Sequence, residues 1–541
     1  MRVSSIEVEV SVSRSPVLRG RVTPTVSVIL SSRHDRAQLH ALLAQLVPQC
    51  SRADAQLLVA RPGPASDSAA LAKVFSGVTF VHGPADATDQ QLRSLAMTQT
   101  SADVVLFADD RRPLERGSVE TLRRRLSADP EAQVESTAHR LVAERAAHGD
   151  GVSADAGQAA GSGAAFADST AAAPAHPELS VIVPVHQGAK VLPQSLAALV
   201  ASDFPRARWE LIVVDDASTD DSALAAAPFA DVIVRIPTKP YGPAYARNRG
   251  TQLSRGQILV FVDADVSVHP ETLGRFAAAF DAEPEVSAIS GSYDDRPPGD
   301  GLVSLYRNLL QHFQHQQGAG PVDRFWACCG AVRSGVFTEA GMYDEWRFRR
   351  PQIEDIELGR RIRALGHRAV LRPDIQATHL KRWTLRSMVA TAVHDRGVPW
   401  MRMDAEEAGR ATRPRPSVQA VNTGYTWLAI AVAAVAVYLR EGWYLLAAAA
   451  PLVPVLYNNR RQYAFFARKC GLPFALATVL LDLLNYAVNG VALVVGWALR
   501  EVVGEPKPDA TVQAFAEVGI KTWPPVPTRG VARTSAETRS V

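Results

Sequence analysis

Short apolar runs alternate with amphipathic stretches along most of the chain. The runs VSVIL (26–30), LSVIVPV (179–185), LIVV (211–214) and ILVFV (258–262) contain almost only large apolar residues. Such runs are typical of buried parallel strands, because both faces of these strands are covered by helices. The stretches between the runs have helical spacing. The pattern therefore predicts an α/β fold built on a mostly parallel sheet.

Three blocks near the N-terminus resemble three later blocks in the spacing of their apolar residues, and they occur in the same order. The pairs are residues 26–46 with 179–199, 55–60 with 209–218, and 102–122 with 256–276. Similarity over a whole supersecondary unit predicts a duplicated half-domain. A loose alignment of any two Val-rich α/β stretches is the alternative.

Composition changes sharply at two points in the 541 residues, a length that allows several domains. Residues 147–176 are rich in Ala, Gly, Ser and Asp and predict a disordered linker, and the chain becomes strongly apolar after about residue 416. The predicted division is an N-terminal tail (1–23), a half-domain (24–146), the linker (147–176), an α/β domain with interfacial helices (177–415), a membrane region (416–500) and a polar tail (501–541).

The membrane region begins with two apolar segments, 424–439 and 442–457. Each is short for a membrane span of about 20 residues, so we expect a helical hairpin with Arg440 and Glu441 at its tip. The basic stretch 458–469 is then expected in the cytoplasm. Core helices of a third soluble domain are the alternative.

A longer apolar stretch, 472–499, contains Asp482, Asn485 and Asn489. It predicts either one span with an inward polar face or a tight hairpin. The region therefore holds two to four transmembrane helices. Residues around Trp383, Met388, Val389, Trp400 and Met401 are expected at the membrane interface.

Charge and cysteine content narrow the choice of partners and compartment. The formal net charge of +3 is near neutral for this length and does not favour a nucleic-acid partner. The four cysteines form no CxxC pair, which suggests free thiols in a reducing compartment. The first residues lack the apolar core of a signal peptide, so we expect the α/β domain in the cytoplasm.

Acidic residues directly follow two of the predicted strands. Asp215 and Asp216 follow 211–214, and Asp263 and Asp265 follow 258–262. The carboxyl ends of parallel strands border the crevice in which open α/β sheets bind ligands. Carboxylates there suit a divalent cation that neutralises phosphate oxygens. Each acidic pair alone is equally compatible with a simple turn.

The order of several motifs resembles that of nucleotide-sugar-dependent glycosyltransferases of family 2. The motifs are PVHQGA (184–189), VVDDAS (213–218), ARNRG (246–250), DAD (263–265), IEDIELGRR (353–361) and HLKRW (379–383). The resemblance extends over about residues 177–400. It implies the GT-A fold, a Rossmann-like mixed sheet, here preceded by a degenerate half-copy and followed by transmembrane helices.

The resemblance also implies roles for individual residues. Asp355, beside Glu354, corresponds to the base that deprotonates the acceptor hydroxyl. Asp265 and His379 correspond to ligands of a divalent metal, Mn²⁺ or Mg²⁺, and Asp263 contacts the ribose or the metal. The remaining predicted nucleotide-sugar contacts are Pro184, Val185, His186, Asp215, Asp216, Arg247 and Arg382.

These features predict a metal-dependent, inverting glycosyltransferase in the cell membrane, with several spans and a cytoplasmic catalytic domain. Its expected donor is a nucleotide-diphosphate sugar, and its acceptor is lipid-linked or a cell-envelope glycan. The alternatives are a catalytically degenerate sugar-binding or scaffold subunit and a processive polysaccharide synthase. The chain lacks a Gln-x-x-Arg-Trp motif, which disfavours the processive synthase.

Two departures from the family pattern qualify this picture. Ala217 stands where many members have Gly, which matters if the turn requires a positive φ. Where the second copy has Asp215-Asp216, the first reads Ala60-Arg61-Pro62, and the first has Arg111 at the position of Asp265. A guanidinium there would repel a cation, so we expect the first copy to be catalytically inactive.

Overall fold

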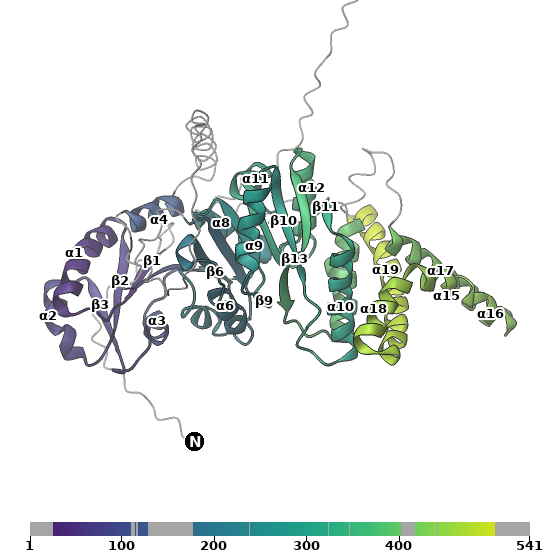
Figure 1. Cartoon of the computed structure of the whole chain (residues 1–541), viewed down its shortest axis with the longest axis horizontal. Coiled ribbons are helices and arrows are strands. Elements are labelled where there is room, and N and C mark those ends of the chain that lie inside the picture. The colour runs from purple at the N-terminus through teal and green to yellow at the C-terminus, as the bar shows by residue number, and fades with distance from the viewer. Residues whose placement is uncertain are drawn as a thin grey trace, which may run out of the picture.

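A computed structural model describes residues 25–109, 114, 117–127, 177–236, 239–322, 324–345, 347–401, 417–440 and 442–503. The predicted N-terminal tail, the linker at 147–176, Arg111 and residues 504–541 lie outside the described residues. Figure 1 shows the described parts in a row, with the N-terminal strands at one end, the main α/β region in the middle and a helical bundle at the other end.

The strands of the described residues form one mixed sheet of 13 strands. They are β1 (Val26–Ser31), β2 (Ala55–Pro62), β3 (Val78–Gly83), β4 (Val104–Asp109), β5 (Leu179–Val185), β6 (Trp209–Asp216), β7 (Val232–Ile236), β8 (Ile258–Val262), β9 (Val266–Val268), β10 (Val286–Tyr293), β11 (Gly320–Val322), β12 (Cys329–Arg333) and β13 (Arg368–His379). Their order is β11-β13-β10-β12-β8-β5-β6-β7-β4-β1-β2-β3, and β9 pairs with β13 beside this path.

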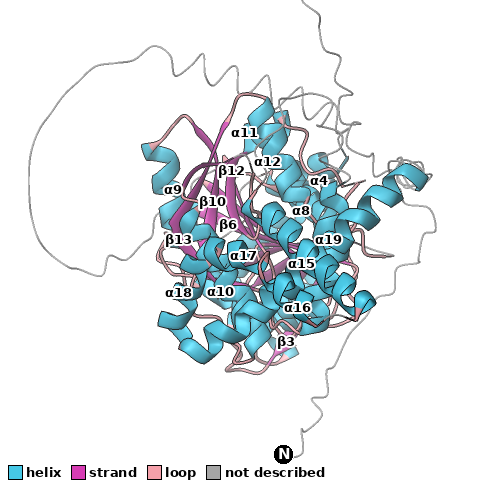
Figure 2. Cartoon of the chain, turned by 90° about the vertical axis from the view of Figure 1, so that its right-hand side faces the viewer, coloured by secondary structure: helices cyan, strands magenta, loops and turns pink. Residues whose placement is uncertain are grey.

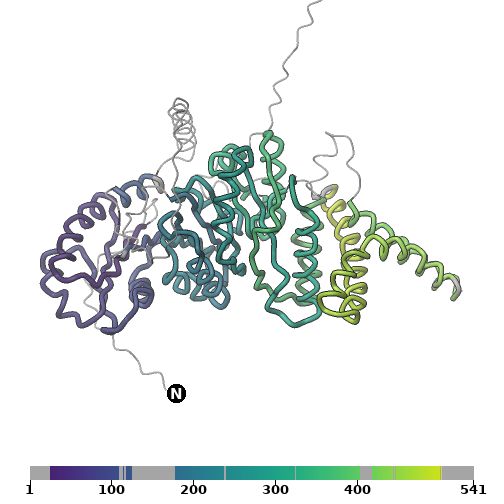
Figure 3. Tube along the Cα trace, viewed as in Figure 1, coloured from purple at the N-terminus to yellow at the C-terminus, as the bar shows by residue number. Residues whose placement is uncertain are grey.

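Two groups of four parallel strands have the same internal order within this sheet. One is β4-β1-β2-β3 and the other is β8-β5-β6-β7. An antiparallel pairing of β4 with β7 joins them edge to edge, so the N-terminal unit continues the main sheet. In the trace of Figure 3, the purple N-terminal unit lies directly beside the main α/β region. The matching order supports the predicted duplication, which stays a prediction.

Helices cover both faces of the sheet. They are α1 (Arg36–Arg52), α2 (Ala69–Val74), α3 (Asp89–Met97), α4 (Ser118–Ser127), α6 (Leu192–Val200), α7 (Ser222–Ala226), α8 (Pro243–Leu253), α9 (Thr272–Ala282), α10 (Leu302–Gln317), α11 (Ser334–Glu339), α12 (Glu354–Ala364) and α13 (Leu385–Ala390), with short 3₁₀ turns η1 (Ala65–Ser68) and η2 (Arg206–Arg208) and a π-helical turn η3 (Thr391–Gly397). Alternate strand residues enter different cores: Val181 and Val183 lie on one side of β5, and Ile182 lies on the other.

The bundle contains α15 (Val418–Leu439), α16 (Trp443–Ala449), α17 (Leu452–Asn458), α18 (Arg460–Cys470) and α19 (Leu472–Val503). The helix α15 ends at Arg440, whose φ of 57° reverses the chain, and α16 and α17 return along α15. Of the two alternatives for residues 472–499, the structure has a single helix. Among the described residues, Val418–Leu439 and Leu472–Leu499 are long and apolar enough to cross a membrane.

The helix α10 connects the bundle to the main α/β region, and in Figure 2 it lies close to α18. Its Tyr306 packs in a cluster that includes Trp383, Met388 and Phe466. Trp383 and Met388 are 7% and 1% exposed, so the expectation that they lie at a membrane interface is wrong for these two side chains. They are instead held between the α/β region and the bundle.

A buried polar network lies inside this junction. The hydroxyl of Tyr306 donates to Asp482 of α19 at 2.5 Å, and Gln462 donates to the other carboxylate oxygen at 2.8 Å. Asn459 links this centre to Asn422 of α15 through a hydrogen bond of 3.0 Å. A buried carboxylate needs such partners, because an unpaired charge in an apolar bundle is strongly destabilising.

Candidate active site

The acidic residues at the end of β8 lie in a turn beside the end of β13. The backbone carbonyl of Asp265 accepts a hydrogen bond of 2.8 Å from the N–H of Leu380. The adjacent residue, His379, ends β13 and pairs with Val266 of β9. The sheet therefore brings together two predicted metal ligands that are more than a hundred positions apart in the sequence.

The side chains of Asp265 and His379 face each other, with Oδ2 and Nε2 3.8 Å apart. Burial and the charge of Asp263 raise the pKa of Asp265 to about 6, against the opposing effect of Lys381. Burial lowers the pKa of His379 to about 3, and the charge of Lys381 acts in the same direction. His379 is therefore neutral at physiological pH, which is the form that binds a metal.

Asn308 of α10 fixes the orientation of the His379 ring. Its Oδ1 lies 2.8 Å from Nδ1 of His379, and its Nδ2 donates to the carbonyl of Lys381 at 3.1 Å. Because Nδ2 is used as a donor, Oδ1 is the acceptor, so Nδ1 carries the proton and Nε2 keeps its lone pair toward Asp265. Tyr293 stacks on the ring at 4.4 Å between centroids.

This pair suits a divalent cation that is completed by substrate oxygens. Among the described residues, no group of three or more His, Cys, Asp and Glu side chains is arranged to hold a metal. One carboxylate and one neutral imidazole are the protein ligands present, and Mn²⁺ accepts this mixed set. Cations that act on phosphates are commonly held by one or two carboxylates together with the phosphates themselves. The donor set therefore fits the predicted Mn²⁺ or Mg²⁺.

Arg247 joins the two acidic motifs of the site. Its guanidinium donates to Asp263 at 2.6 Å and to Glu354 at 2.9 Å, and its side chain is 5% exposed. The second carboxylate oxygen of Glu354 accepts the N–H of Gln352 at 2.8 Å. Arg247 is thus engaged with protein carboxylates, and the predicted contact of Arg247 with a diphosphate stays a prediction.

Asp355 lies at the start of α12, beside this ion-paired group. Its two carboxylate oxygens accept the backbone N–H groups of Ala327 at 3.3 Å and Ile356 at 2.8 Å. Burial and the charge of Glu354 raise the pKa of Asp355 to about 7, although Arg247 opposes the shift. A carboxylate with a pKa near neutrality can both accept and release a proton, as a general base must.

The acids at the end of β6 differ in how they are bonded. The carboxylate of Asp216 accepts the N–H groups of Tyr241 and Gly242 at 2.9 and 2.7 Å and so holds the start of α8. Asp215 accepts the backbone N–H of Ser218 at 3.1 Å and is also hydrogen-bonded to the side chain of Ser218. Burial raises the pKa of both carboxyls. Asp216 is thus engaged by the start of α8, whereas these contacts of Asp215 stay within its own turn.

Ala217 follows these acids with a φ of 54°. This is the left-handed region, which an L-residue other than glycine enters at a cost of about 1–2 kcal/mol. The turn therefore does require the conformation for which glycine is suited. The turn is held by the N–H of Ala217, which donates to the carbonyl of Asp215 at 3.0 Å.

The remaining predicted nucleotide contacts occupy different environments. Pro184 and Val185 are buried in β5, whereas His186 is exposed and its Nδ1 lies 2.7 Å from the carbonyl of Asp216. His186 is therefore next to the acids of β6. Arg382 follows Lys381 in the sequence. Its side chain is exposed and lies near Gly299.

Three further side chains line the centre and were not singled out from the sequence. They are Asn308, Tyr293 and Cys328. The side chains of Tyr293 and Cys328 are hydrogen-bonded to each other. Burial and the charge of Asp263 raise the pKa of Cys328 to about 12, so its thiol is protonated and unreactive at neutral pH. Their positions depend on pairing between distant strands, and local sequence patterns give no signal for that.

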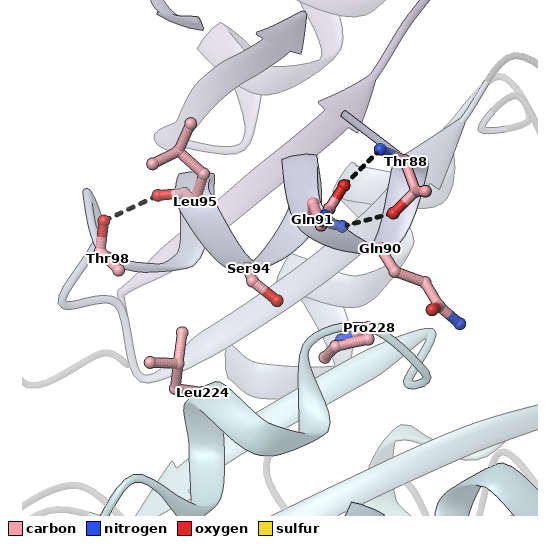
Figure 4. A pocket seen from close by; sticks show the side chains of 8 residues that line it. All are labelled: Thr88, Gln90, Gln91, Ser94, Leu95, Thr98, Leu224 and Pro228. Atoms are coloured by element: carbon pink, nitrogen blue, oxygen red, sulfur yellow. Dashed lines mark hydrogen bonds between the residues drawn. The ribbon is translucent and has the colours of Figure 1, made fainter. Parts of the chain in front are cut away.

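An open groove lies away from this centre, between α3 of the N-terminal unit and α7 (Figure 4). Its lining consists of Thr88, Gln90, Gln91, Ser94, Leu95, Thr98, Leu224 and Pro228. Thr88 and Gln91 already bond each other's backbone N–H groups at the start of α3. These neutral side chains offer no acid, base or metal ligand.

Comparison with known proteins identifies the central part of the chain. Residues 180–339 match the family described as glycosyl transferase family 2. The chain carries a family 2 glycosyltransferase domain. The matched residues include Asp215, Asp216, Asp263 and Asp265, and they end before Asp355 and His379.

Relatives of this glycosyltransferase domain come from archaea and bacteria. Glycosyltransferase AglE of Haloferax volcanii is 33% identical over 145 residues, which are 26% of this chain and 47% of that protein. Poly(ribitol-phosphate) beta-N-acetylglucosaminyltransferase TarS of Staphylococcus aureus is 34% identical over 107 residues, 19% of this chain and 18% of that protein. Undecaprenyl-phosphate 4-deoxy-4-formamido-L-arabinose transferase of Shewanella sediminis is 32% identical over 106 residues, 18% of this chain and 32% of that protein. The chain thus spans less than half the length of each of these relatives.

Among solved structures, the chain is similar to the mannosyltransferase PcManGT of Pyrobaculum calidifontis, in complex with GDP-Man and Mn²⁺. It is 20% identical, with a TM-score of 0.38, over 59% of this chain and 88% of that one.

Proposed function

We propose that the protein is a metal-dependent, inverting glycosyltransferase. It transfers a sugar from a nucleotide-diphosphate sugar to a hydroxyl group of a lipid-linked or cell-envelope glycan acceptor. The main support for the proposal is the set of carboxylates bonded to Arg247. This buried arginine holds Asp263, next to the Asp265–His379 pair, and Glu354, next to Asp355. A predicted base and a predicted metal-binding pair thereby border one centre.

The proposed reaction is a single displacement at the anomeric carbon. Asp355 accepts the proton of the acceptor hydroxyl while the acceptor oxygen forms a bond to that carbon. The bond between the carbon and the diphosphate oxygen breaks on the opposite face, so the anomeric configuration is inverted. The electron pair of the broken bond stays on the leaving nucleoside diphosphate. The raised pKa of Asp355 suits this role, since the base must bind the proton it removes.

Positive charge is needed where the diphosphate leaves. A Mn²⁺ or Mg²⁺ ion held by Asp265 and His379 would supply a Lewis acid for the phosphate oxygens. Lys381 lies close enough to lower the pKa of Asp265 through its charge and is placed to stabilise the same negative charge. Asp215, which does not hold the start of α8 as Asp216 does, is the proposed contact to the nucleobase.

The proposed location is the cell membrane, with the catalytic domain in the cytoplasm, where nucleotide sugars are made. Two helices long and apolar enough to cross a membrane support this location. The cluster around Tyr306 holds the bundle against the catalytic domain, which would keep the site near the bilayer surface. Relatives whose names specify poly(ribitol-phosphate) and undecaprenyl-phosphate support an acceptor of the cell-envelope class.

The test uses membranes containing the full-length protein, a panel of UDP-, GDP- and dTDP-sugars, and Mn²⁺. Transfer and donor hydrolysis are measured for the native protein and for three variants. Asp265→Ala should abolish both activities. Asp355→Asn should abolish transfer while donor binding remains, because the base is lost and the metal ligands are intact. Asp374→Asn, an exposed carboxylate paired with Arg372 on the same sheet, is the matched control and should behave as native.

Normal transfer by both Asp265→Ala and Asp355→Asn would refute the assignment of the site. Hydrolysis or transfer that persists in excess EDTA would refute the requirement for metal. The anomeric configuration of the product, read by NMR coupling constants, separates an inverting reaction from a retaining one.

A further inference from the structure

The carboxyl ends of the parallel strands β1, β2 and β3 lie at one edge of the N-terminal unit, here called the N-terminal crevice because parallel sheets bind ligands at this edge. The two units can be compared through their strand pairing, in which Val26 stands opposite Ala55 in the first unit and Leu179 stands opposite Trp209 in the second. Counted from these pairs, Ala60 occupies the position of Val214, and Arg61, the next residue, occupies that of Asp215. At equivalent points of two sheets with the same strand order, a carboxylate is replaced by a guanidinium.

Most of the hydrogen-bonding capacity of Arg61 is unused. Its Nη2 donates to the backbone carbonyl of His34 at 2.8 Å, which holds the guanidinium beside the end of β1. Its Nε and Nη1 are buried and have no hydrogen-bond partner. Within the described ranges, Arg61 also has no ion-pair partner. Arginine is rarely held in this way, because buried N–H groups are nearly always bonded.

A second basic side chain, His82, lies beside Arg61. His82 of β3 stands opposite Arg61 in the sheet, and its Nδ1 lies 3.1 Å from the carbonyl of Gly63, which leaves Nε2 for another partner. Burial lowers the pKa of His82, and the charge of Arg61 acts in the same direction. His34 and His82 are both half-buried, so both imidazoles remain partly accessible to solvent.

The acidic residues near the crevice are engaged elsewhere. Asp89 pairs with Arg33 at 3.1 Å, and Asp35 accepts the N–H of Gln38 at 2.8 Å as the N-cap of α1. Asp67, whose charge acts on His82, accepts the hydroxyl of Ser66 at 3.3 Å. Among the side chains that the structure describes, Arg61 therefore has no carboxylate partner.

We propose that this crevice, formed by His34, Arg61 and His82, binds a phosphate group. The planar guanidinium matches phosphate oxygens through paired N–H donors, and Nε and Nη1 form such a pair on one edge of Arg61. The crevice also lies beside the point where the strand order reverses between β1 and β4, the usual place for phosphate-bearing ligands in parallel sheets. The ligand is a nucleoside diphosphate or a free polyphosphate. This site is separate from the centre at Asp263 and does not depend on the proposed transferase function.

The test uses the full-length protein in detergent with EDTA, on an Asp265→Ala background that weakens the metal-dependent donor site. Binding of inorganic pyrophosphate and of UDP is measured by calorimetry, and the melting temperature is measured with and without each ligand. Saturable binding is expected, with Kd raised at least tenfold by Arg61→Gln and raised less by Arg61→Lys. Arg52→Gln is the matched control, because Arg52 is a 64%-exposed arginine of the same unit paired with Glu120, and its Kd should stay unchanged.

Ligand binding should raise the melting temperature of the parent protein but not that of Arg61→Gln. If Arg61→Gln does not fold, the Kd values and melting temperatures of Arg61→Lys and His82→Gln are compared with those of the parent protein instead. UDP binding at least tenfold tighter than pyrophosphate binding identifies a nucleotide ligand, and equal Kd values identify the polyphosphate alone as the recognised group. Absence of saturable binding by both ligands, or equal Kd values in the parent and in all Arg61 and His82 variants, would overturn the proposal.

Discussion

Replacing Asn308 by Ala tests whether the ring of His379 is held ready for a metal. In the native protein, Oδ1 of Asn308 accepts Nδ1–H of His379 at 2.8 Å, so Nε2 faces Asp265 with its lone pair. Both side chains are buried, at 2% and 7% exposure, so water does not readily replace the lost acceptor. A buried N–H group left without a partner costs about 1–3 kcal/mol. The tautomer with a proton on Nε2, which cannot bind a metal, then becomes favoured.

About 1.4 kcal/mol corresponds to a tenfold change in affinity. Mn²⁺ should therefore bind about 10- to 100-fold more weakly to Asn308→Ala than to the native protein. A loss of this size is typical when the hydrogen-bond partner of a ligating histidine is removed. Free Mn²⁺ is followed by electron paramagnetic resonance during titration of the purified protein, which needs no catalytic turnover. Gln314→Ala, an exposed change on the same helix, is the control and should leave Kd unaltered. Mn²⁺ binding to Asn308→Ala as tight as to the native protein would show that Asn308 does not position His379.

Three other changes test separate parts of the structure. At saturating Mn²⁺, kcat should rise with pH through a midpoint near 7 and fall tenfold per pH unit below it, because Asp355 acts only when deprotonated. Glu354→Gln should lower this midpoint, since the charge of Glu354 raises the pKa of Asp355. An unchanged midpoint would exclude Asp355 as the titrating base. Ala217→Gly should raise the free energy of unfolding by about 1 kcal/mol by relieving a positive φ, and denaturant titration that shows a loss instead would contradict this. Tyr306→Phe should lower the melting temperature, because Asp482 loses a buried hydrogen bond worth about 1.5–3 kcal/mol. An unaltered melting temperature would mean that water replaces the hydroxyl of Tyr306.

The placement of acids at strand ends was predictable because two local signals agree. Apolar runs at 211–214 and 258–262 indicate buried strands, and the acids follow at once, where a parallel sheet opens into its crevice. The structure has β6 and β8 at these positions. Sequence pattern alone also indicated that a positive φ at Ala217 would be significant, and the turn has that φ.

Contacts made across long stretches of sequence were not predictable. Arg247 and Glu354 are 107 positions apart, and their ion pair depends on how α8 and α12 pack over the sheet. In the sequence, Arg247 has the features of a phosphate-binding arginine, and nothing local shows that two carboxylates engage it. Asn308 lies within an ordinary amphipathic helix, 71 positions from His379. The antiparallel pairing of β4 with β7 likewise depends on two sheet edges that both need hydrogen-bond partners, which no local pattern encodes.

The spacing of two residues on α10 explains how the bundle and the catalytic centre are held in a fixed relation. Tyr306 and Asn308 are two positions apart, so they point to nearly opposite sides of the helix. Tyr306 bonds Asp482 in the bundle, and Asn308 bonds His379 at the proposed metal site. Both bonds are buried, and a rotation of α10 that preserved one would break the other. The helix therefore sets the orientation of the Asp265–His379 pair relative to α19. In the proposed membrane-anchored enzyme, this contact would fix the angle between the catalytic centre and the membrane surface.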